Sequence, residues 1–223
     1  MKQHSVFITA AMFGLAAFSA LATPLAAPLT DTMARLMADM PGTYDTADQL
    51  GAEAVQGVPE AARHERRHVI YARIDAPQIG PNVFFRQERK GGPEGEIVAR
   101  GLAVFEPDAQ ANGIRMWLRN IINAPRYTDL HLKKELWSEV TFDPTYGGKC
   151  PFHWRLENDT LVGTLLGGGC KITSNAGKAM AFDARWEVTA TSLSIFDNSY
   201  NGEGQLLSGR ADKVPTRYAR LAK

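Results

Sequence analysis

The chain has 223 residues, of which 44% are hydrophobic and 22% charged, proportions close to those of ordinary globular proteins. Its 25 basic and 24 acidic residues give a formal net charge of +1, which argues against a nucleic-acid-binding protein, because such a protein needs a basic face. This length and composition fit one globular domain and argue against a disordered, collagen-like or coiled-coil chain.

The first 22 residues have the pattern of a secretory signal peptide. A short basic start precedes an apolar run over residues 6–22, which ends in the small-x-small sequence Ala20-Leu21-Ala22. The run is short for a membrane span. We therefore expect export to the periplasm or the extracellular space, one domain over residues 23–223 and no integral membrane segment after cleavage. An uncleaved anchor is the alternative.

The rest of the chain predicts one short helix followed by many strands. Apolar residues recur at helical spacing from Leu29 to Met40, and Pro41-Gly42 ends that helix. Residues 45–63 show no clear period. Alternating residues then predict strands at 69–74, 82–88, 96–106, 113–119, 150–157, 160–166, 178–189, 192–197, 204–210 and 216–221, with a short helix at 128–139. So many short strands indicate an antiparallel barrel or sandwich, and a closed barrel leaves no exposed edge strands.

Two cysteines, Cys150 and Cys170, flank a predicted hairpin with its turn at Asn158-Asp159. The flexible run Gly167-Gly168-Gly169 allows the chain to bring the two cysteines together. In an exported chain this spacing predicts one disulfide. Two free thiols, one of them reactive, are the alternative.

The segment His64-Glu65-Arg66-Arg67-His68 matches H-E-x-x-H, which on a helix places two zinc-binding histidines on one face. Here the residues from Val69 onward predict a strand, and no convincing third ligand follows. A solvated, charged segment leading into a strand is therefore favoured, and no metal site is expected. A zinc protease is a distant alternative.

The first long hairpin carries the candidate ligand-binding residues. Phe84, Arg86 and Glu88 share one face of a strand, because side chains alternate along it. If the loop centres near Gly92, Arg100 shares that face across the hairpin. Arginines bind carboxylates by two-point hydrogen bonding, and a glutamate accepts N–H groups. The set predicts a pocket for an anionic ligand with N–H groups, such as a tetrapyrrole; a solvent-exposed face of surface ion pairs is the alternative.

Several segments between residues 36 and 221 fall in the order of a known family's landmarks. They are the leading helix with Pro41-Gly42-Thr43-Tyr44, the aromatic pair followed by glutamine and glutamate in Val83-Phe84-Phe85-Arg86-Gln87-Glu88, the arginine at Arg100, and the cysteines Cys150 and Cys170. In these segments the sequence resembles the CpeT/CpcT chromophore lyase family.

That resemblance implies a single antiparallel calycin- or lipocalin-like β-barrel preceded by a short helix. It also implies a protein that binds a linear tetrapyrrole (bilin) and attaches it to a cysteine of a client protein. Glu88 and Arg100 would then be catalytic, and Phe84, Arg86 and Arg100 would bind the ligand. No cofactor beyond the bilin is expected, and a homodimer stays open. The alternative function is an exported, non-catalytic carrier of a small apolar acid.

Overall fold

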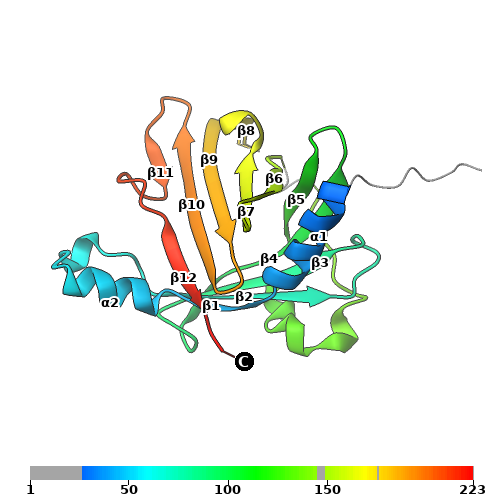
Figure 1. Ribbon diagram of the computed structural model, residues 1–223, viewed down its shortest axis with the longest axis horizontal. Coiled ribbons are helices and arrows are strands. Elements are labelled where there is room, and N and C mark those ends of the chain that lie inside the picture. The colour runs from blue at the N-terminus through cyan, green and yellow to red at the C-terminus, as the bar shows by residue number, and fades with distance from the viewer. Residues whose placement is uncertain (1–26, 145–148, 175, 223) are drawn as a thin grey trace, which may run out of the picture.

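The computed structural model describes residues 27–144, 149–174 and 176–222, which form an antiparallel β-barrel (Figure 1). Twelve strands of this part of the chain make one sheet, and pairing of β9 (Ala179–Val188) with β10 (Ser192–Asn201) closes ten of them into a ring. The predicted fold class, an all-β calycin- or lipocalin-like barrel, is therefore confirmed. The predicted signal peptide, residues 1–22, lies outside the described residues.

The ring follows chain order except where it closes. From β10 it continues through β12 (Thr216–Arg220), β1 (Gly42–Asp45), β2 (Arg67–Ile74), β3 (Val83–Lys90), β4 (Glu96–Asp108), β5 (Gly113–Asn120), β6 (Phe152–Glu157) and β7 (Thr160–Leu165) back to β9. Two short strands, β8 (Cys170–Thr173) and β11 (Leu206–Ser208), pair with the far ends of β9 and β10. The β9–β10 hairpin therefore extends past the ring and carries one extra strand on each side (Figure 1).

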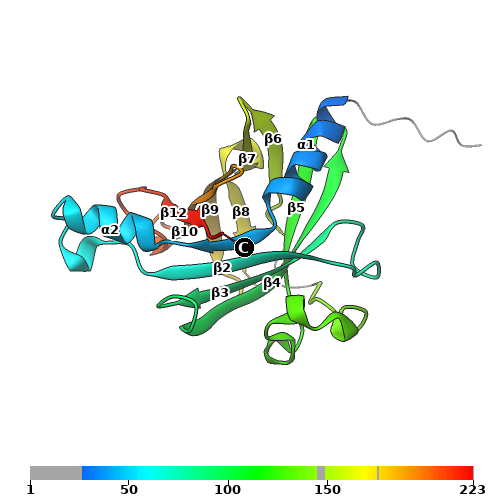
Figure 2. The same ribbon diagram turned by 60° about the horizontal axis from the view of Figure 1, so that its bottom comes forward.

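The predicted N-terminal helix is α1 (Ala27–Asp39), and it lies beside β5, β6 and β7 (Figure 2). Leu36 and, directly after the helix, Met40 are fully buried in the barrel core, as the helical spacing predicts. At the same end of the barrel, Arg35 of α1 forms an ion pair with Asp159 in the β6–β7 turn, with 3.8 Å between Nη1 and Oδ1. The helix thus covers one end of the barrel, so that apolar side chains fill this end.

A helix that the sequence does not predict, α2 (Ala47–Val55), follows β1. No residue of α2 is buried. A helix without a buried face needs no apolar stripe, which explains why residues 45–63 show no helical period. The helix projects from the side of the barrel near β12 (Figures 1 and 2).

The helix predicted at residues 128–139 is instead a chain of short 3-10 turns, η2 (Ala124–Tyr127), η3 (Leu130–Leu132) and η4 (Lys134–Leu136). Asp129 has a left-handed backbone, with φ 54°, which interrupts a continuous helix. Tyr127 and Leu130 of this segment pack with Phe85 and Leu102 on the outer face of β3 and β4 (Figure 2). The barrel therefore has a second small core outside its wall.

The predicted cysteine hairpin is confirmed in β6 and β7. Its two turn residues, Asn158 and Asp159, have φ values of 45° and 64°, as a two-residue hairpin turn requires. Cys150 and Cys170 form the predicted disulfide, with their Cα atoms 5.8 Å apart. A disulfide is compatible with an exported protein. Within the described residues, no helix has the length and apolar character needed to cross a membrane.

Candidate ligand-binding site

A cavity of about 670 Å³ opens at the end of the barrel away from α1. Strands β9 and β10 supply much of its wall, and most of the other strands, among them β2, β3, β6 and β12, contribute one or more side chains. Most of the lining is apolar, and its largest members are Phe152, Phe182, Trp186, Ile195 and Phe196. Its volume lies within the range of about 300–1,000 Å³ that is typical of small-molecule sites.

Two of the predicted residues, Arg86 and Glu88, point into this cavity from β3. Arg86 donates a hydrogen bond to the Glu88 carboxylate through Nη2. Arg67 on β2 donates to the other Glu88 oxygen, with 3.2 Å between Nη1 and Oε1. Glu88 thus lies between two guanidinium groups and is 8% exposed. The alternative of a solvent-exposed face of surface pairs is wrong for this strand.

Tyrosine and aspartate side chains surround this cluster. Tyr71 lies beside Arg86 on β2, and burial raises the pKa of its phenol to about 12. Asp197 on β10 faces the cavity and keeps access to solvent there, yet its position inside the barrel raises its pKa from 3.8 to about 6. Arg86 lowers that pKa and Glu88 raises it, to smaller extents. Asp197 therefore exchanges a proton close to neutral pH.

Two buried donors of this cluster lack a hydrogen-bond partner among the described residues. The Nε atom of Arg86 is buried and makes no hydrogen bond with any described residue, and the Tyr71 hydroxyl makes none of good geometry. A buried donor without a partner carries a desolvation cost. Acceptor atoms of a ligand would relieve that cost.

Phe84 occupies a different place from its two neighbours on the same face. Its ring is fully buried and meets Phe105 edge to face, with ring centroids 5.4 Å apart. It packs in the barrel core and is not among the side chains that line the cavity. Phe84 belongs to the strand that carries Arg86. The prediction that Phe84 contacts the ligand directly is nevertheless not supported, because its side chain does not line the cavity.

Arg100 does not join the cluster, so the prediction that it shares a face with Glu88 is wrong. Near the turn, β3 and β4 pair in the expected parity, but a β-bulge follows in which Val98 is the extra residue. Beyond the bulge, Glu88 faces Ala99, and Arg100 lies opposite Gln87. A shift of one residue moves every later side chain to the other face of the sheet. Arg100 therefore lies on the outer face of β4.

The H-E-x-x-H segment does not form a zinc site. His64 precedes β2 and contacts the Glu53 carboxylate, whereas His68 lies within β2 and contacts Asp45, with 3.2 Å between Nδ1 and Oδ2. Both histidines are buried, at 6% and 5% exposure, so the expectation of a solvated segment is wrong for them. Glu65 instead pairs with Arg67 and with a lysine on β3. Among the described residues, no group of His, Cys, Asp and Glu side chains is arranged to hold a metal ion.

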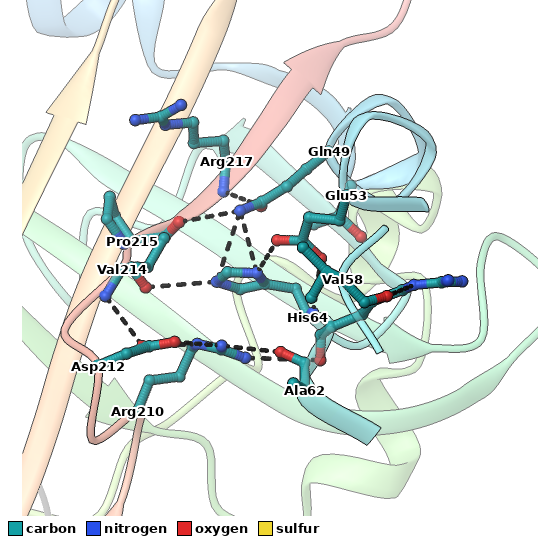
Figure 3. A network of polar contacts seen from close by, with 12 residues as sticks. Gln49, Glu53, Val58, Ala62, His64, Arg210, Asp212, Val214, Pro215 and Arg217 are labelled. Atoms are coloured by element: carbon teal, nitrogen blue, oxygen red, sulfur yellow. Dashed lines mark hydrogen bonds and ion pairs between the residues drawn. The ribbon is translucent and has the colours of Figure 1, made fainter. Parts of the chain in front are cut away.

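His64 belongs to a polar network that attaches α2 to the loop between β11 and β12 (Figure 3). Its ring Nε2 lies 3.3 Å from the Val214 carbonyl oxygen, and Gln49 of α2 donates to the Pro215 carbonyl at 3.2 Å. Arg210 donates to the Ala62 carbonyl oxygen at 2.9 Å. Because Arg210 and Val214 also line the cavity, this network fixes one side of its opening.

Three cavity-lining side chains that interact with Arg86 or Glu88 were not among the predicted site residues, namely Arg67, Asp197 and Tyr218. The sequence carries a signal for two of them. Leu193 and Ile195 alternate as inward residues of β10, and the same alternation places Asp197 inward. Arg67 alternates with the buried Val69 in the same way.

Fold and site together define this molecule as a calycin-like barrel that encloses a guanidinium–carboxylate cluster in an otherwise apolar cavity. Neither a protein-family model nor a curated protein sequence matches the chain. Among solved structures, the chain is similar to the CRL protein of Arabidopsis, with a TM-score of 0.65 and 9% identity over 86% of this chain and 98% of that chain. It is also similar to the T-type phycobiliprotein lyase CpeT from Prochlorococcus phage P-HM1, with a TM-score of 0.47 and 7% identity over 87% of this chain and 99% of that chain. At 9% identity, the similarity to the CRL protein is one of fold.

Proposed function

We propose that the barrel binds a linear tetrapyrrole of the bilin class in its cavity. The observation that carries this proposal is the cluster in which Glu88 lies between Arg67 and Arg86, inside a cavity with largely apolar walls. The two guanidinium groups are suited to the propionate carboxylates of a bilin. The Glu88 and Asp197 carboxylates are suited to its pyrrole N–H groups, and the aromatic walls to its flat rings.

The protein is then a chromophore lyase-like enzyme, as the sequence resemblance implies. In that reaction the thiol of a client protein adds across an exocyclic double bond of the bilin. A carbon–sulfur bond forms, the carbon–carbon π bond breaks, and the thiol proton passes to the bilin. The barrel holds the bilin in one orientation toward the thiol, which supplies rate by proximity. Glu88 hydrogen-bonds the pyrrole N–H groups, and Asp197, with a pKa of about 6, holds a proton near the ligand.

The site of action that we propose is outside the cytoplasm, with residues 23–223 as the mature domain. The Cys150–Cys170 disulfide supports this location, because disulfides persist in oxidising compartments. Cys150 also lines the cavity, so the disulfide belongs to the wall of the ligand site. An exported, non-catalytic carrier of a small apolar acid is the second candidate, and the largely apolar lining favours it.

The proposal is tested by titrating residues 23–223 with biliverdin, haem and octanoate. We expect a saturable change in the biliverdin absorption spectrum at one ligand per chain, weakened by roughly tenfold or more in Arg86→Gln through loss of a charged hydrogen bond. Arg217→Gln, which removes an arginine that lines neither cavity, should bind like the parent. Octanoate binding that Arg67→Gln weakens, without any response to a tetrapyrrole, would favour the carrier instead, because Arg67 lines only the barrel cavity.

Attachment needs its own measurement. The bilin-loaded protein is mixed with an unmodified phycobiliprotein subunit, and the subunit is then denatured and examined for covalently bound pigment. Pigment on the client cysteine supports a lyase. Tight bilin binding with no transfer to any client would reduce the protein to a bilin carrier.

A further inference from the structure

A second cavity, of about 470 Å³, lies where the paired part of β4 and β5 ends. Its wall is formed by the β4 segment from Ile97 to Leu102 and by the end of β5 with the residues after it, from Leu118 to Ile121. Arg86 and Leu118 line both this cavity and the barrel cavity. The two spaces are therefore neighbours that share part of one wall.

The charge of this second cavity is of one sign. Among the residues that the structure describes, three arginines line it, Arg86, Arg100 and Arg119, and no acidic side chain does so. The whole chain carries a formal charge of only +1, so the excess is local to this place. Of the three, Arg86 is already neutralised by Glu88.

Arg100 and Arg119 have no acidic partner among the described residues. The Nε atom of Arg100 is buried without a hydrogen bond. The Arg119 guanidinium lies over two aromatic rings, 4.9 Å from the Trp117 centroid and 5.0 Å from that of Phe142. A partly buried guanidinium without an acceptor is costly, and a second one nearby adds repulsion.

The sheet register places these two side chains within reach of one anion. Leu102 pairs directly with Arg119, so Arg100, two residues earlier on the same face, is the diagonal neighbour of Arg119. Such neighbours are about 7–8 Å apart, a span that two long side chains close around one group. The β-bulge at Val98 is what moves Arg100 onto this face, and bulges often re-aim a side chain next to a functional site.

Apart from Asn120 and the glycine at position 101, the remaining lining residues are apolar, and they define the body of the ligand. Ile97, Val98, Leu102, Leu118 and Ile121 surround the two arginines, and Val98 is 41% exposed beside the opening. We propose that this side cavity binds an amphipathic organic anion, whose oxyanion head, a carboxylate or a phosphate, lies between Arg100 and Arg119. Its apolar body lies against β4. The site is separate from the bilin site and does not depend on it.

The test uses the mature chain with 15N-labelled arginines, titrated with octanoate and, separately, with octyl phosphate. The Nε–H resonances of Arg100 and Arg119 are assigned by their absence in Arg100→Gln and Arg119→Gln. We expect both resonances to shift in a saturable way, and the head group that saturates at lower concentration identifies the anion. Shifts confined to Arg67 and Arg86 would place the ligand in the barrel instead and overturn the proposal.

Affinity provides an independent measurement. Arg100→Gln and Arg119→Gln should each weaken binding by about tenfold or more, the loss of one charged hydrogen bond. Arg100→Lys should restore only part of it, since a lysine lacks the planar fork, and Arg217→Gln should leave it unchanged. Circular dichroism confirms that each variant is folded. If both glutamine variants bind octanoate and octyl phosphate as tightly as the parent, the proposed site is refuted. Biliverdin binding is measured in the same variants to test the barrel cavity separately, because neither arginine lines that cavity.

Discussion

At the scale of single residues, Glu88 organises the polar cluster of the barrel cavity. It accepts hydrogen bonds from Arg67 and Arg86 and is almost fully buried, so its charge is balanced entirely by neighbouring side chains. The sequence placed Arg86 and Glu88 together correctly, because both depend only on the alternation within one strand. It paired them with Arg100 rather than Arg67, because that choice depends on the register between strands.

Replacing Glu88 should therefore destabilise the empty protein. In Glu88→Gln the guanidinium groups of Arg67 and Arg86 lose the carboxylate that balances their charge. Both arginines are partly exposed to water. We therefore expect the free energy of unfolding to fall by only about 2 kcal/mol. Urea unfolding measures it. Glu96→Gln, an exposed position at the start of β4, is the matched control and should change little. Equal stability of parent and Glu88→Gln would mean that the cluster is not held by this carboxylate.

Asp197 should make stability depend on pH. Its pKa is about 6 in the folded barrel against an ordinary 3.8, so the folded state binds the proton more tightly than the unfolded state. The stability that this group contributes is complete below pH 3.8 and is lost as the pH rises to about 6. Because the carboxylate reaches solvent in the cavity, we expect a loss of only about 1 kcal/mol.

Asp197→Asn should remove this dependence. Unfolding is followed between about pH 4 and pH 8 in both proteins. The parent should lose stability relative to Asp197→Asn as the pH rises through that range, so that the asparagine variant is the more stable protein at neutral pH. Parallel pH profiles would show that Asp197 ionises as it does in the unfolded chain.

At the scale of elements, tight contacts between strands set which substitutions the barrel accepts. A Cβ atom at Gly163 on β7 would lie 2.5 Å from the Trp154 ring, which is fully buried. Trp154 in turn meets Trp186 edge to face, with centroids 6.4 Å apart. The glycine is needed because β6 and β7 bring this large ring directly against the opposite backbone.

Gly163→Ala should therefore destabilise the protein by about 2 kcal/mol through overpacking. Gly51→Ala makes the same chemical change in the exposed helix α2, where a Cβ meets no atom within 4 Å. We expect that control to be neutral or to stabilise by about 0.5–1 kcal/mol, because alanine favours helix. Thermal unfolding compares the two. A Gly163→Ala variant as stable as Gly51→Ala would show that the Trp154 ring moves freely.

At the scale of the whole molecule, the disulfide joins the start of the β6 segment to β8 at the open end of the barrel. Cys150 and Cys170 are 20 residues apart in sequence, and Cys150 faces the ligand cavity. Only four residue pairs hold β8 to β9. The covalent link therefore secures an end of the barrel whose other attachments are few.

The double variant Cys150→Ser, Cys170→Ser should lose about 3 kcal/mol of unfolding free energy, the value expected for closing a loop of this length. Bilin affinity should fall with it, because the cavity wall is freed at Cys150. Thiol counting on the denatured parent should find no free thiol before reduction and two after it. Free thiols without reductant would contradict the bond.

Local patterns in the sequence were enough to predict most strands and α1. Alternation in a strand and helical spacing in a helix both arise because one face of the segment is buried. This pattern is visible in the sequence of the segment alone. The helix α2 has no such face and was missed. The turns from η2 to η4 were taken for one helix, because their apolar spacing resembles a helix while Asp129 breaks its backbone.

The sequence by itself determined the all-β class, the cysteine hairpin and the shared face of Arg86 and Glu88, since each depends on neighbours along the chain. Tertiary structure alone decided which side chains complete the site. The extra residue at Val98 reverses the facing of Arg100, and the pairing of β12 with β1 carries β10, and Asp197 on it, to the side of the barrel where Arg86 lies. Both depend on how strands pair with one another, which the alternation within a single strand does not encode.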